Sequence, residues 1–81
     1  MISEKDLGLL LKKQLDKDPH SIAEWAYELY FSESEFTFGA DNVLENLMLM
    51  DSDPQMELTV EQLSDLAERL LKGEKDAINK I

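Results

Sequence analysis

The chain has 81 residues, a net charge of -10 and a hydrophobic fraction of 43%. This length allows one domain, 1–81, with a modest core, and the hydrophobic fraction is too high for a disordered acidic tail. The chain contains no cysteine, which excludes disulfides, thiol catalysis and zinc–thiolate sites, and no apolar run approaches the roughly 20 residues that cross a bilayer.

Two helices are expected in the first part of the chain. Ser3 and Asp6 form an acidic variant of a capping box, and leucines at helical spacing follow, so we predict a helix over 3–17. Leu9 widens its apolar face. Asp18-Pro19 then ends this helix and starts the next, predicted over 19–32. The apolar face of the second helix contains Ile22, Trp25, Ala26, Leu29 and Tyr30.

The middle of the chain is expected to contain a loop and a third helix. Residues 32–39 alternate serine with glutamate and then continue as Phe-Thr-Phe-Gly, which indicates a loop without a strand partner. The third helix is predicted from Ala40 or Asp41 to Met50, with a broad apolar face. Asp, Ser and Pro residues at 51–54 end it with a turn.

A fourth helix begins at the clearest capping signal in the chain, Thr59 with Gln62. Apolar residues recur at helical spacing as far as Leu71, and Gly73 follows as a C-terminal cap. Residues 74–81 are expected to form a short helical turn that packs back on the rest. The sequence therefore predicts an all-α, compact four-helix bundle with a short C-terminal helical turn, either monomeric or dimeric.

The distribution of charge indicates a partner. Between Asp18 and Glu68 the chain carries thirteen acidic residues and no lysine or arginine, whereas the remainder carries five acids and eight bases. Such a field repels nucleic acid and anionic lipid and attracts basic surfaces. We therefore expect a basic protein as partner, and neither nucleic acid nor membrane. The alternative is that the acidity serves only solubility.

No residue pattern indicates catalysis, a metal or a cofactor. The one histidine, His20, lacks the spaced partners of a zinc site, and three glycines are too few for a phosphate-binding loop. The segment 51–62 begins like a calcium loop, but Met56 and Gln62 stand where glycine and glutamate are needed. The start of the chain has no basic, then apolar, secretory signal. We therefore expect a cytoplasmic protein that is not an enzyme.

Six aromatic residues lie between Trp25 and Phe38. A bundle this small buries about three of them well, so we expect Trp25, Tyr30 and one phenylalanine in the core. The others alternate with acids, a pattern typical of a binding surface with aromatic anchors. Phe36 and Phe38 could instead fold into the bundle as a plug. The predicted partner-binding residues are eight carboxylates and three anchors: Glu24, Glu28, Glu33, Glu35, Asp41, Glu45, Asp51 and Asp53, with Tyr27, Phe31 and Phe36.

The chain resembles two kinds of small acidic helical protein. The segment Gly39-Ala40-Asp41-Asn42-Val43-Leu44 resembles the Gly-Ala-Asp-Ser-Leu segment of acyl carrier proteins, in which the serine carries phosphopantetheine. Asn42 stands at the matching position and has no hydroxyl to modify. This resemblance therefore implies only a degenerate carrier-like domain without its prosthetic group.

The second resemblance is to the small helical immunity proteins that accompany bacterial colicin-like and contact-dependent growth inhibition toxins. It lies in the size, the absence of cysteine and the segments Ile22–Tyr27 and Glu57–Leu63. It implies an antitoxin that inhibits a cognate nuclease toxin, often one acting on transfer RNA, by steric and electrostatic occlusion. The alternative function is an acidic adaptor, regulator or nucleic-acid mimic that binds a basic DNA-binding protein.

Overall fold

The computed structural model describes the whole chain, Met1–Ile81. Its elements are α1 (Glu4–Lys12), α2 (Pro19–Tyr30), α3 (Phe38–Ser52), α4 (Val60–Leu71) and two 3-10 helices, η1 (Pro54–Met56) and η2 (Ala77–Lys80). The predicted all-α bundle of four helices with a short C-terminal helical turn is confirmed. None of the helices has the length and apolar content that a membrane span requires.

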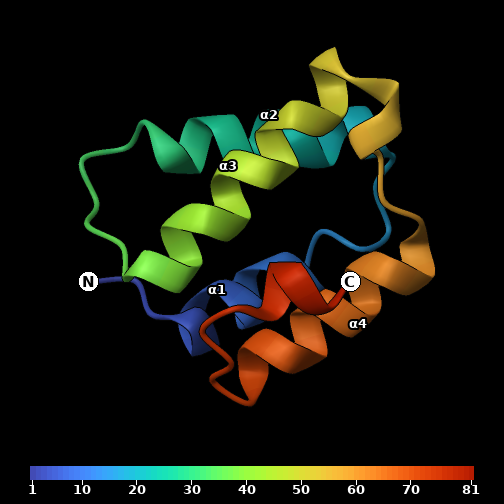
Figure 1. The fold of residues 1–81 in the computed structure, drawn as a ribbon. Coiled ribbons are helices and arrows are strands. Elements are labelled where there is room, and N and C mark those ends of the chain that lie inside the picture. The colour runs from blue at the N-terminus through green and yellow to red at the C-terminus, as the bar shows by residue number, and fades with distance from the viewer.

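The helices form two layers (Figure 1). In one layer α2 packs along α3, and in the other α1 packs along α4. The third helix also contacts α1 and η2, so it joins the two layers. One layer is therefore continuous in sequence, whereas the other combines the two ends of the chain.

Side-chain caps fix where the helices begin. Ser3 and Asp6 form the predicted capping box of α1, and Thr59 and Gln62 form that of α4. Asp18 accepts a hydrogen bond from the Ser21 amide at 2.7 Å, directly before Pro19 at the start of α2. The structure thus confirms these predicted helix starts. They could be predicted from the sequence because each cap is a local interaction between residues three apart.

Four predicted helix bounds differ from the structure. The first helix ends at Lys12 rather than residue 17, because i-to-i+3 turns replace the helix: the Gln14 amide bonds Leu11 O, and the Lys17 amide bonds Gln14 O. The second ends at Tyr30 rather than Ser32. The third begins at Phe38, two residues early, because the Thr37 hydroxyl caps the Ala40 amide, and it extends to Ser52.

The loop before α3 is not isolated, contrary to expectation. Ile2 and Phe36 form a parallel β-bridge, in which the Ile2 amide donates to Glu35 O at 2.7 Å and the Thr37 amide donates to Ile2 O at 3.0 Å. This bridge holds the N-terminus against the entry to α3. The pairing was missed because its partner lies more than thirty residues away in sequence.

One hydrophobic core lies between the layers and consists of 15 buried residues from all four helices and η2. Leu7, Leu11, Leu44 and Leu66 are among its fully buried side chains. Ala77 is buried and Ile78 and Ile81 pack against the core, so the C-terminal turn docks back as predicted. Leu9 is 55% exposed and does not widen the buried face of α1, which corrects that expectation.

Candidate functional site

Two exposed aromatic residues mark the outer face of α2. Tyr27 and Phe31 lie one helical turn apart, their ring centroids are 4.7 Å apart, and they are 58% and 63% exposed. We call this pair the aromatic strip. Tyr30 meets Phe31 edge to face at 5.1 Å and stacks on Phe36 at 6.4 Å. Since Tyr30 and Phe36 both pack against the core, they support the strip from below.

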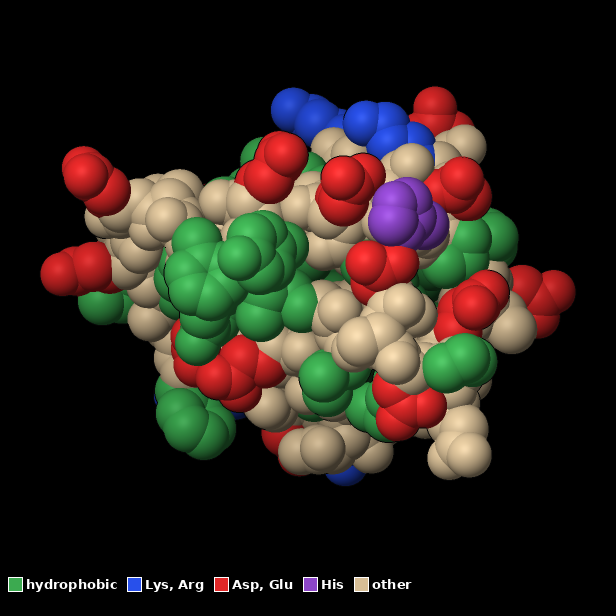
Figure 2. Space-filling model, turned by 90° about the horizontal axis from the view of Figure 1, so that it is seen from above, with side chains coloured by type: hydrophobic (Ala, Val, Ile, Leu, Met, Phe, Trp, Pro, Cys, Tyr) green, Lys and Arg blue, Asp and Glu red, His purple; other side chains and the backbone are tan.

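Carboxylates lie on both sides of the aromatic strip. Glu24 and Glu28 follow each other at helical spacing on α2, next to Tyr27 and Phe31. On the other side, the Tyr30 hydroxyl donates to Glu45 Oε1 of α3 at 3.1 Å. This hydrogen bond, followed by desolvation of the hydroxyl and then by the charge of Asp41, raises the pKa of Tyr30. Figure 2 shows the result, a hydrophobic cluster with acidic side chains above and below it, and lysines or arginines only at the edge of the view.

Most of these carboxylates have no cationic partner within the chain. The salt bridges formed by lysine and arginine join residues of α1, α4 and the segment after α4, all outside the α2/α3 layer. Within that layer, only Glu24 and Asp51 are paired, both with His20. The charges of the other six predicted contact carboxylates are therefore available to a partner.

His20 joins the start of α2 to the end of α3. Its Nδ1 lies 2.5 Å from Asp51 Oδ1, and its Nε2 lies 3.7 Å from Glu24 Oε2. The hydrogen bond to Asp51 is the main cause of a raised His20 pKa, followed by the charges of Asp51, Glu24 and Asp18. His20 is thus exposed at the start of a helix, as expected from the sequence, but it is also ion-paired.

We expect the His20 ion pairs to make folding stability depend on pH. The folded pKa is raised above the usual 6.5, so the contribution is fully present below about pH 6.5 and is lost as the pH rises through the folded value. Because the chain has one histidine, its imidazole signals in NMR report this pKa directly. Asp51→Asn should move the pKa back toward 6.5, and H20Q should remove this part of the pH dependence of urea unfolding. A wild-type imidazole pKa at or below 6.5 would contradict the ion pair.

The structure spreads the predicted contact residues along the whole α2/α3 layer rather than in one cluster. A central group surrounds the aromatic strip and consists of Glu24, Glu28, Asp41 and Glu45. Glu33 and Glu35 are exposed in the loop that follows α2. At the opposite end, Asp51 binds His20, and Asp53 caps η1 by accepting a hydrogen bond from the Gln55 amide.

The three predicted anchors differ in exposure. Tyr27 and Phe31 are exposed, whereas Phe36 is half-buried against the core and linked to Ile2. Phe36 therefore serves as support for Tyr30 more than as a free anchor, which agrees with the plug alternative for this residue. Phe38, in contrast, is 86% exposed and does not plug the bundle. No local pattern in the sequence predicts the half-burial of Phe36, because it accompanies a bridge to the distant residue Ile2.

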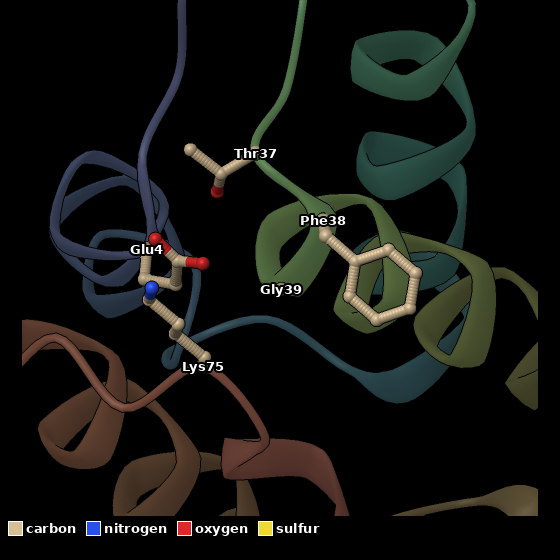
Figure 3. A pocket seen from close by; sticks show the side chains of 5 residues that line it. All are labelled: Glu4, Thr37, Phe38, Gly39 and Lys75. Carbon is tan, nitrogen blue, oxygen red and sulfur yellow. The ribbon is translucent and has the colours of Figure 1, made fainter.

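A second feature is a small cavity where α1, α3 and the C-terminal segment meet. It has a volume of about 190 Å³ and is lined by Glu4, Thr37, Phe38, Gly39 and Lys75 (Figure 3). Glu4 is the only buried charged residue. A Cβ at position 39 would lie 2.6 Å from the Lys75 carbonyl oxygen and would overlap the Glu4 carboxylate. The cavity is smaller than the roughly 300–1,000 Å³ of usual ligand sites. We therefore interpret it as a feature of the close packing between α1, α3 and the C-terminal segment.

Comparison of the chain with known protein families, with curated proteins and with solved structures finds no match.

Proposed function

We propose that this chain is an acidic binding protein that neutralises a basic partner by covering it with the outer face of the α2/α3 layer. The observation that carries the proposal is the exposed aromatic strip between carboxylates, of which only Glu24, paired with His20, has a cationic partner within the chain. A monomer that only needed solubility would gain nothing from exposing two adjacent rings at its most acidic surface.

The two components of this surface act at different stages of binding. Unpaired carboxylates attract a basic protein over a distance of about a Debye length, roughly 8 Å at physiological salt, and speed the encounter. The aromatic strip becomes buried only in the complex and slows dissociation. Such a surface gives fast capture and slow release, which an inhibitor of a toxic enzyme requires.

We further propose that the partner is a nuclease toxin domain and that the chain is its immunity protein, or antitoxin. A nuclease presents basic residues to its phosphate-rich substrate, and an acidic surface of this length can occupy the same region. The α2 helix of 12 residues extends about 18 Å, comparable to several nucleotides of a strand. The function requires neither catalysis nor a cofactor.

The test combines capture with an activity assay. The tagged chain is used to isolate proteins from a lysate of its source organism at about 50 and 300 mM salt, and the bound proteins are identified. We expect one basic protein in stoichiometric amount, with nuclease activity that the chain suppresses. A DNA-binding protein without nuclease activity would favour the adaptor or mimic function. A set of many basic proteins that salt removes together would contradict specific binding.

Charge reversal in the loop after α2 should weaken capture. Glu33→Lys with Glu35→Lys changes the net charge from -10 to -6, and we expect weaker binding and a smaller dependence on salt, with unchanged helicity by circular dichroism. The matched control is Glu57→Lys with Glu61→Lys, two exposed carboxylates outside the predicted surface. It makes the same change in net charge, so equal effects of the two pairs would show that only total charge matters.

A further inference from the structure

The aromatic strip exposes two rings to solvent in a defined arrangement. Tyr27 and Phe31 are tilted at 48° to each other and lie beside Tyr30, which meets Phe31 at 73°. Tyr30 is in turn fixed by its hydrogen bond to Glu45 and by its stacking on Phe36. Binding a ligand on these rings therefore costs little conformational entropy, because the rings are already ordered by their neighbours.

Charge decides which class of partner can occupy the strip. A second copy of the chain would bring a like-charged surface against Glu24, Glu28 and Glu45, and like charges at close range are unfavourable. Anionic lipid and nucleic acid are repelled for the same reason. A cationic group is attracted both by the charge of the carboxylates and by the electron-rich faces of the exposed rings.

Among the cations of proteins, the guanidinium group fits this arrangement better than the ammonium group. It is planar and weakly hydrated, so it can stack on Tyr27 or Phe31 while its edge donates hydrogen bonds to a carboxylate at the side of the strip. The ammonium of lysine is a compact, strongly hydrated point charge, and it cannot satisfy both interactions as well.

We infer that the aromatic strip is a receptor for an arginine side chain of the partner, and that this surface selects arginine over lysine. The inference rests on the proposed function and narrows it, since it names the residue type that a basic partner inserts between Glu24 and Glu28 on one side and Asp41 and Glu45 on the other.

The test uses hexa-arginine and hexalysine peptides, which have equal length and charge. Their affinities for the ¹⁵N-labelled chain are measured by NMR titration at about 50 mM salt, and the shifted amides locate the site. We expect hexa-arginine to bind about 3- to 10-fold more tightly, with the largest shifts near Tyr27 and Phe31. The variant Y27L with F31L should lose most of this preference, because it keeps apolar surface and removes the rings. Phe38→Leu, at an aromatic residue that is 86% exposed outside the strip, is the matched control and should keep the preference.

Each other outcome overturns the inference in a distinguishable way. Equal affinities of the two peptides at the α2/α3 face would overturn arginine selection and leave the proposed function standing. A preference that persists in Y27L with F31L would show that the carboxylates alone produce it. Absence of shifts on α2 and α3 with either peptide would overturn the proposed function as well, because the face would then bind no cation.

Discussion

Replacing Leu44 by alanine is expected to lower the free energy of unfolding by about 2–5 kcal/mol. Leu44 is completely buried, and it lies on α3, the helix that contacts both layers. The loss combines the transfer free energy of the removed carbons with the cost of a cavity that the surrounding helices fill only partly. A chain of this length has a total stability of about 4–12 kcal/mol, so the variant should lose a large part of it.

Urea unfolding followed by circular dichroism measures this effect, with the fluorescence of the single tryptophan, Trp25, as a second probe. Leu49→Ala is the matched control, because it makes the same chemical change on the same helix at a side chain that is 45% exposed. We expect it to cost less than about 1 kcal/mol. Similar losses for the two variants would contradict the assignment of Leu44 to the centre of the core.

The second large effect is expected at Gly8, where the backbones of α1 and α4 approach each other. A Cβ at this position would lie 2.9 Å from the Leu71 amide nitrogen, 3.0 Å from the Ala67 carbonyl oxygen and 3.0 Å from Leu70 Cβ. Two of these three atoms belong to the backbone of α4 and cannot rotate away. Alanine at position 8 therefore has to push the two helices apart.

Gly8→Ala carries two opposing contributions to stability. Alanine raises intrinsic helix stability by about 0.5–1 kcal/mol, whereas overpacking costs about 1–3 kcal/mol. We expect a net loss of about 1–2 kcal/mol, seen as a lower urea midpoint, with partner binding by the α2/α3 layer unchanged at temperatures where the variant is folded. Leu9→Ala, at the exposed neighbouring residue, is the control and should be nearly neutral. A gain in stability for Gly8→Ala would show that α1 and α4 are not in close contact.

Gly8 also shows what the sequence could and could not predict. Helix starts follow from caps between residues three apart, so Ser3, Asp18 and Thr59 were assigned correctly. The close contact at Gly8 depends on α4, which is distant in sequence, and no local pattern encodes it. The early end of α1 at Lys12 is likewise produced by turns that lead into the second layer.

The features of the candidate surface also divide into those that the sequence predicts and those that depend on contacts between distant segments. Helical spacing alone places Tyr27 beside Phe31, and Glu24 beside Glu28. The support of Tyr30 by Glu45 and Phe36, and the pairing of His20 with Asp51, require the antiparallel packing of α2 on α3. Exposure of the aromatic residues was therefore predictable for Tyr27 and Phe31 but not for Phe36 and Phe38.

The division of the fold into one layer that is continuous in sequence and one that is not has a consequence for the order of folding. The α2/α3 pair spans residues 19–52, and its contacts are local in sequence, so their formation costs little loop-closure entropy. The leucines of α1 are covered only when α4, which is distant in sequence, packs against them. We therefore expect the α2/α3 pairing to form early in folding and the α1/α4 pairing, which completes the core beneath the acidic surface, to form later.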